Sequence, residues 1–256
     1  MTKKEIAQLL IKKSVEYNHP DFIQTDPIQI PHRFSKKEDI EISAFLAAVI
    51  AWGQRTTIIK NANRLVKWMD NSPHDFILNH SEKDLKPFSE FVHRTFNGVD
   101  CLTFVSALKN LYKNHGGLEL AISSSFESDP SYPGIGWCNF KSRFFEVPHL
   151  KRTLKHLPDP TKGSAAKRMN MFLRWMVRKD DAGVDFGIWR SMHPSQLYIP
   201  LDVHTGRVAR KLSLLKRKQN DWKAVIELNE QLHKINPQDP VHCDFGLFGL
   251  GAFEKF

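Results

Sequence analysis

The chain has 256 residues, which is long enough to bury one large core or two small ones packed side by side. Hydrophobic residues make up 41% of it and charged residues 25%, a balance that excludes wholesale disorder. Lysine and arginine outnumber aspartate and glutamate 37 to 28, giving a formal net charge of +9. This excess favours nucleic-acid partners, because each phosphate that is neutralised releases condensed counterions. A basic surface without such a partner is the alternative.

The cysteine pattern indicates a reducing compartment, and the hydropathy pattern indicates a protein without a membrane span. Cys101, Cys138 and Cys243 are odd in number and far apart, a pattern typical of neither a disulfide framework nor a C-x-x-C metal site. The sequence has no apolar run of about 18 residues and no signal-peptide pattern at its start. We therefore expect a soluble, cytoplasmic protein, associated with the nucleoid and without a membrane partner.

Helical periodicity dominates the first half of the chain. Residues 1–17 form an amphipathic pattern, and Ser35–Glu38 is a capping-box sequence that precedes the apolar segment 40–52. Further helices are predicted over 56–69 and 98–121. Apolar segments with so few charges are buried on most sides.

The Ser-, Pro- and Gly-rich segment 123–136 is the one long loop signal. No alternating strand of useful length is present. We therefore expect an all-α fold, a single helical unit over 1–256 with two lobes and a hinge in this loop. The remaining helices are predicted near 137–148 and after Ser164, Asp202, Asp221 and Asp239-Pro240.

The first stretch that bears on chemistry covers residues 156–178. A turn containing Pro and Gly leads into a helix with Ser164 as its expected N-cap. Lys167, Arg174 and Arg178 share one face of that helix and form a basic line. A helix start beside lysines can bind phosphate through its free N–H groups. A solvated basic face on a core helix is the alternative interpretation.

The second stretch covers residues 199–215. Asp202 follows Pro200 and opens a helix, where a capping Asp is worth roughly 0.5–2 kcal/mol. A helical protein with Lys167 on its surface and Asp202 as a cap alone is therefore one hypothesis. A zinc site is not expected, because the available ligand residues lack any standard metal spacing. These residues are His193, His204, His242 and Cys243.

Together these stretches resemble the helix-hairpin-helix DNA glycosylase superfamily. Lys167–Asn170 matches its K-x-x-N element, and Leu201–Arg207 matches its V-D-x-H-x-x-R element with the essential Asp. Ala51–Thr56 is similar to the family's Gln-x-Thr helix end. The resemblance covers roughly residues 40–251, and it implies a two-lobed helical fold with a helix-hairpin-helix element.

Some features depart from the superfamily pattern and indicate a particular branch. The Leu-Pro-Gly-Val-Gly hairpin is replaced by the longer segment 157–163. The insertion 179–196 widens the separation of the two motifs, as in the archaeal 8-oxoguanine DNA glycosylase branch, which the ending 239–251 also resembles. The chain is similar to a bacterial family distantly related to that branch. It lacks the cysteine quartet of iron–sulfur relatives, so no cofactor and no iron–sulfur cluster are expected.

The resemblance implies base-excision-repair chemistry. Lys167 would attack the sugar C1′ and form a Schiff base, and Asp202 would stabilise the sugar cation. The partner would be double-stranded DNA with a damaged purine, such as 8-oxoguanine, flipped out of the stack. A DNA-binding relative that keeps the fold without catalysis is the alternative.

The resemblance also suggests a base pocket and a phosphate grip. Trp52, Trp189 and Phe245 are candidate stackers, with core packing as the alternative for each Trp, and Gln54 and Asp244 are candidate readers of the base edge. The run Lys216-Arg217-Lys218 would add diffuse attraction or be a solvated loop. The candidate phosphate ligands are Lys162, Gly163, Ser164, Arg207 and Arg210.

Overall fold

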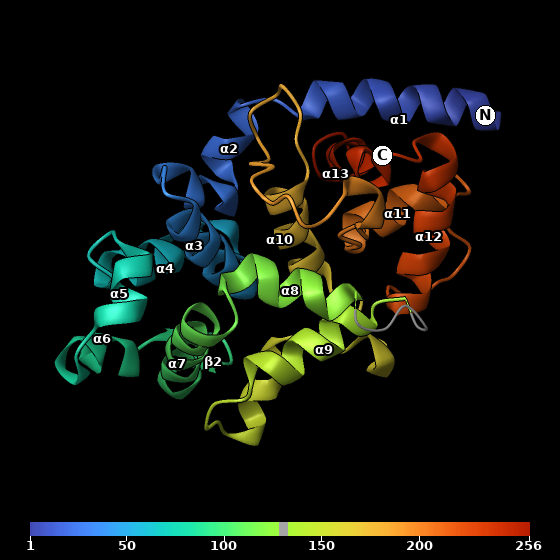
Figure 1. The fold of residues 1–256 in the computed structure, drawn as a ribbon. Coiled ribbons are helices and arrows are strands. Elements are labelled where there is room, and N and C mark those ends of the chain that lie inside the picture. The colour runs from blue at the N-terminus through green and yellow to red at the C-terminus, as the bar shows by residue number, and fades with distance from the viewer. Residues whose placement is uncertain (128–132) are drawn as a thin grey trace. The chain divides into compact units, whose positions relative to one another are not determined.

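The computed structural model describes residues 1–127 and 133–256, and it confirms the all-α fold (Figure 1). The chain forms two compact units. The terminal unit consists of Met1–Gln24 and Pro160–Phe256, and the central unit consists of Thr25–Asp159.

The expected hinge segment, 123–136, lies within the central unit and not between the two units. Residues 128–132 of that segment are outside the described residues. The helices on either side, α8 (Gly117–Glu127) and α9 (Ile135–Phe144), pack against each other. The Ser, Pro and Gly content identifies a connection but does not reveal that the elements it joins share one core.

In the terminal unit, α1 (Lys3–Tyr17) lies along α13 (Cys243–Ala252), which also packs against α11 (Val203–Lys211) (Figure 1). Glycines permit the close approach, because a Cβ at Gly246 would lie 2.8 Å from the carbonyl oxygen of Leu10. The other elements of this unit are α2 (Asp21–Thr25), which ends at the boundary, η5 (Pro160–Lys162), α10 (Lys167–Val177), η6 (Pro194–Gln196), α12 (Trp222–Ile235) and η7 (Pro240–His242).

The central unit is built around α3 (Lys37–Val49), which is buried along most of its length, as its apolar sequence predicts. Phe45 of this helix contacts the rings of Phe104, Phe140 and Phe144. The other elements are η1 (Pro27–Gln29), η2 (Pro31–Arg33), α4 (Arg55–Trp68), α5 (Pro73–Asn79), η3 (Glu82–Leu85), α6 (Lys86–Ser89), β1 (Val92–His93), β2 (Phe96–Asn97), α7 (Gly98–Asn114) and η4 (Lys151–His156). Strands β1 and β2 are antiparallel, with His93 opposite Phe96.

The predicted helices are present, with differences at their ends. The capping box at Ser35–Glu38 is wrong, because α3 starts at Lys37 and Lys36 caps it without a side-chain bond. The segment 98–121 forms two helices and not one, since Gly116 has a φ of +72°, which ends α7.

Within residues 1–127 and 133–256, no helix has the length and apolar character needed to cross a membrane. Cys101, Cys138 and Cys243 are free thiols, and Cys101 and Cys243 are buried.

Candidate active site

Lys167 is the first residue of α10. The residue before it, Ala166, has a left-handed backbone with a φ of 50°, so the incoming loop turns sharply just before the helix. Ser164 was predicted to cap this helix, and that prediction is wrong. Its Oγ instead accepts a hydrogen bond from the N–H of Ala166 at 3.3 Å, within the loop. The Lys167 amine is therefore carried on the first turn of a regular helix, and its position depends on this turn.

Asp202 is the N-cap of α11, as predicted. One oxygen, Oδ1, accepts a hydrogen bond from the N–H of Thr205 at 2.9 Å. The backbone is held as well, because Asn220 Nδ2 donates to the carbonyl oxygen of Asp202 at 2.9 Å. These contacts fix the carboxylate and leave Oδ2 available to other groups.

The two residues meet despite their separation in the sequence. Lys167 Nζ lies 3.8 Å from Asp202 Oδ2, which is an ion-pair distance too long for a hydrogen bond. The side chain of Lys167 is 34% exposed and that of Asp202 is 20% exposed. The amine and the carboxylate therefore lie next to each other, and both are partly exposed.

The K-x-x-N motif has a structural explanation here. Asn170 Nδ2 donates to the carbonyl of Ile199 at 3.3 Å, three residues before Asp202. Ile199 is also held by its own N–H, which donates to Asn229 Oδ1 at 2.9 Å. Asn170 therefore connects the helix that carries Lys167 to the segment that carries Asp202.

A third carboxylate, Asp244 of α13, is buried and accepts a hydrogen bond from Arg174. Burial raises the pKa of Asp244 to about 6, against the opposing effect of the Arg174 cation, and the negative charge of Asp202 adds to the rise. Lys167 lowers the same pKa, so Asp244 is close enough to both site residues to interact with their charges. Its burial and its bond to Arg174 argue against the predicted role as a reader of the base edge.

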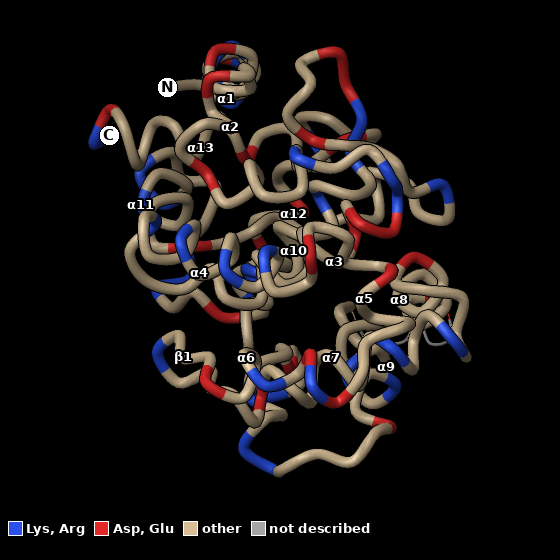
Figure 2. The backbone as a smooth tube through the Cα atoms, turned by 90° about the vertical axis from the view of Figure 1, so that its left-hand side faces the viewer, with Lys and Arg blue, Asp and Glu red and all other residues tan. Residues whose placement is uncertain are grey.

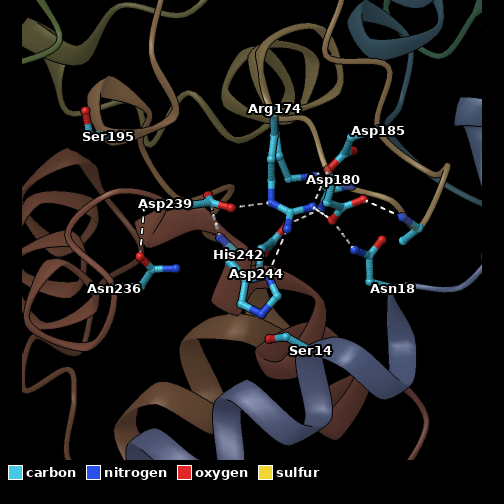
Figure 3. Close-up of polar contacts among 12 residues, drawn as sticks. Ser14, Asn18, Arg174, Asp180, Asp185, Ser195, Asn236, Asp239, His242 and Asp244 are labelled. Atoms are coloured by element: carbon cyan, nitrogen blue, oxygen red, sulfur yellow. Dashed lines mark hydrogen bonds and ion pairs between the residues drawn. The ribbon is translucent and has the colours of Figure 1, made fainter.

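The predicted basic line on α10 is wrong beyond its first member. Arg174 and Arg178 are buried, and they share Asp185, to which each donates at 3.2 Å. Figure 3 shows the carboxylates that surround these guanidinium groups. Arg178 also contacts Asp180, Asp239 and His242.

Burial shifts the pKa values of an acid and a base in this network in opposite directions, since it favours the neutral form of each. Burial raises the pKa of Asp185, despite its two arginine partners. Burial and the Arg178 cation together lower the pKa of His242, whose Nδ1 lies 2.8 Å from Arg178 Nη2. The network therefore holds buried arginines against carboxylates, and it is neither a phosphate-binding face nor a solvated one.

Two of the predicted base stackers belong to the core. Trp189 is 2% exposed and meets the ring of Phe172 edge-on at 5.5 Å. Phe245 is also buried, with the Arg174 guanidinium 4.2 Å from its ring centroid. Neither ring forms an exposed wall on which a base would stack.

The other two base-pocket candidates lie in the central unit. Trp52 is 45% exposed, and the Arg94 guanidinium lies 5.2 Å from its ring centroid. Its carbonyl oxygen is 3.0 Å from Nε2 of the buried His93. Gln54 is exposed at the N-cap of α4 and makes no side-chain cap bond there. The surface around Trp52 therefore combines an exposed ring, a cation and an amide.

The predicted phosphate ligands have different environments. Lys162 is exposed at the end of η5, and Gly163, which follows it, is also exposed and has a φ of +86°. Arg207 donates to the carbonyl of Gly251 at 2.6 Å, near the end of α13. Arg210 donates to the carbonyl of Arg217 at 2.7 Å and to Asn220 Oδ1 at 2.6 Å. Both arginines therefore hold backbone segments of the protein together.

The family described as "Protein of unknown function (DUF2400)" matches residues 26–253. The chain belongs to the DUF2400 family. No curated protein and no solved structure matches it. The matched segment of this DUF2400 chain includes Lys167, Asp202 and Asp244, so the whole candidate site lies within the region that defines the family.

Asn220 contacts the candidate site of this DUF2400 chain, and the sequence did not suggest it. It precedes Asp221, the N-cap of α12, and a polar residue in that place is typical of a turn. The sequence gives no signal that its side chain reaches Asp202 and Arg210, since both contacts depend on how α11 and α12 pack. Among residues 1–127 and 133–256, no group of three or more His, Cys, Asp or Glu side chains is placed to hold a metal ion.

Proposed function

We propose that this protein is a DNA glycosylase with β-lyase activity that uses Lys167 as nucleophile and Asp202 as the stabilising carboxylate. The observation that supports this is the 3.8 Å distance between Lys167 Nζ and Asp202 Oδ2, at the partly exposed starts of two helices. If Lys167 were only a surface residue and Asp202 only a cap, no close approach would be required. The cap itself uses only Oδ1, so the second oxygen faces the amine.

The proposed reaction uses groups that the chain supplies. The deprotonated amine of Lys167 attacks C1′, the N-glycosidic bond breaks, and the base leaves with the bonding electron pair and takes up a proton. Opening of the sugar ring gives an imine between Nζ and C1′. Loss of a proton from C2′ then expels the 3′ phosphate, which is the lyase step.

Asp202 contributes electrostatic stabilisation, because positive charge develops on the sugar while the glycosidic bond breaks. Asp244 adds a second negative charge nearby whenever it is ionised, as it is above its pKa of about 6. The assignment of a damaged purine as the leaving base rests on the resemblance to the 8-oxoguanine branch. The formal net charge of +9 is consistent with a DNA substrate.

Borohydride trapping tests the proposal directly. The protein is incubated with duplex oligonucleotides that carry 8-oxoguanine, uracil, hypoxanthine or an abasic site, and the imine is reduced to a stable covalent complex. We expect a trapped complex with the wild type and none with Lys167→Gln. Lys12→Gln is the matched control, because Lys12 is an exposed lysine on α1 of the same unit.

A complex that persists in Lys167→Gln would contradict the assignment of the nucleophile. The absence of any complex with the wild type, together with salt-dependent DNA binding, would favour the second candidate, a DNA-binding relative without catalysis. The observation that favours this second candidate is the longer segment 157–163, which replaces the hairpin of the glycosylase superfamily.

A further inference from the structure

The loop between α11 and α12 forms an open pocket of about 590 Å³, at a place that the proposed chemistry does not use. Basic side chains dominate its lining, with one glutamine and one glutamate among them. The lining residues are Lys216, Arg217, Lys218, Gln219, Lys223 and Glu227. Figure 2 shows that Lys and Arg also recur along the neighbouring helix α11.

The acidic residue of the pocket, Glu227, is bonded to the backbone of the loop. The Glu227 carboxylate accepts hydrogen bonds from the backbone N–H groups of Lys216 at 2.6 Å and Arg217 at 3.3 Å. Arg217 is also engaged, because its Nε donates to Asp221 at 2.6 Å. The Glu227 carboxylate therefore holds the backbone of the loop, and the Arg217 side chain is paired with Asp221, which does not line the pocket.

Three lysines keep their charge available to a ligand. In the part of the chain that the structure describes, no ion pair holds Lys216, Lys218 or Lys223. These three ammonium groups line one open pocket, and Glu227 is the single acid among its lining residues. The pocket thus carries a positive charge that its own contacts do not neutralise.

The loop is tied to the candidate active site by direct bonds. Asn220 Nδ2 donates to the carbonyl oxygen of Asp202, and Asn220 Oδ1 accepts from Arg210. Two residues further on, at the start of α12, the N–H of Trp222 donates to the carbonyl of Gly163 at 3.2 Å. A ligand held by the loop would therefore lie on a segment bonded to both Asp202 and the turn before α10.

We propose that this pocket, lined by Lys216, Lys218 and Lys223, is a binding site for backbone phosphates of a nucleic acid. The proposal rests on the proposed function for the identity of the polyanion. Lysine binds phosphate as a point charge, and three of them in an open, polar pocket suit a flexible chain of phosphates. The lining contains no apolar side chain that would insert into lipid, which disfavours an anionic membrane as the partner.

The test is the salt dependence of binding to an undamaged duplex, measured by fluorescence anisotropy between about 50 and 200 mM salt. The variant is Lys216→Gln with Lys218→Gln and Lys223→Gln. The slope of log K against log salt is negative, and each lost phosphate contact reduces its magnitude by about 0.9, so we expect this magnitude to decrease by about 2–3. The charge-matched control replaces Lys3, Lys4 and Lys12 of α1, which are exposed.

An unchanged slope in the loop variant would overturn the proposal, and so would an equal decrease in the α1 control, since that would reflect net charge alone. Loop-dependent binding to anionic phosphatidylserine vesicles without any effect on duplex binding would also overturn it. If the triple variant does not fold, as judged by circular dichroism, Lys218→Gln is used and the expected decrease is about 0.9.

The duplex in this test carries no lesion, so the result does not depend on catalysis. Failed trapping with a normal loop effect would refute the glycosylase chemistry alone. Normal trapping with no loop effect would refute the phosphate site alone.

Discussion

Asp202 carries two roles that substitutions can separate. As N-cap it accepts a hydrogen bond from Thr205, and as a charge it faces Lys167 at 3.8 Å. Asparagine caps a helix about as well as aspartate but has no charge, whereas alanine provides neither the cap nor the charge. Comparing Asp202→Asn with Asp202→Ala therefore distinguishes the structural role of this residue from the chemical one.

The contacts of Asp202 set the expected magnitudes. Loss of the cap in Asp202→Ala costs about 0.5–2 kcal/mol of unfolding free energy. The ion pair with Lys167 is partly exposed at both ends, so its loss costs no more than about 1 kcal/mol. We expect Asp202→Ala to lose about 0.5–3 kcal/mol of unfolding free energy in total and Asp202→Asn about 1 or less. In a chain of this size each kcal/mol lowers Tm by about 2–4 °C.

Thermal unfolding followed by circular dichroism gives the stability, and borohydride trapping gives the activity. Under the proposed mechanism both variants should trap at least roughly a hundredfold more slowly, because each removes the carboxylate that would stabilise the sugar cation. Equal destabilisation by Asn and Ala would refute the capping argument. Trapping by Asp202→Asn at the wild-type rate would refute the role of the charge.

Three further perturbations test the packing around the site. Arg174→Met leaves Asp185 and Asp244 buried without this partner, so we expect a loss of about 3–5 kcal/mol in urea unfolding, and a loss below about 1 would contradict it. The pKa of Asp244 is raised to about 6, so its contribution to stability is present below about pH 4 and lost as the pH rises through 6. Between pH 4 and pH 7 the unfolding free energy of the wild type, measured in urea, should therefore fall by about 2–3 kcal/mol relative to that of Asp244→Asn. A difference between the two proteins that stays constant over this range would contradict the raised pKa of Asp244. In the central unit, a Cβ at Gly98 would lie 1.8 Å from the carbonyl oxygen of Ser89, so Gly98→Ala should cost about 1–3 kcal/mol, and an unchanged Tm would contradict the close packing.

The sequence predicts local features of this fold well. Apolar periodicity locates α3 and α4, and the Asp before α11 is the cap that its position indicates. These features depend on residues within one or two turns of each other. The false capping box at Ser35–Glu38 shows where local patterns fail, because the pattern is present but the N-cap of α3 is Lys36, one residue later.

The environment of Arg174 and Arg178 could not be predicted in the same way. Their spacing places them on one face of α10, but it does not indicate whether that face is exposed to solvent or buried. Their charges are balanced by Asp185 of the following loop and by Asp239 and Asp244, which come from segments more distant in the sequence (Figure 3). Charge alone suggested a phosphate-binding line, and only the tertiary partners show that the two charges are neutralised within the protein.

The arrangement of charges gives α10 two distinct ends. Lys167, at its start, is partly exposed beside Asp202. Arg174, about two turns further along the helix, is buried and held by Asp244. Asp244 interacts electrostatically with both Asp202 and Lys167, so the protonation of one carboxylate affects the charge balance at the other. Above pH 6 the two carboxylates face two cations. Under the proposed mechanism the amine must first lose its proton, which leaves the carboxylates in excess just as positive charge develops on the sugar, and this excess is what would stabilise the transition state.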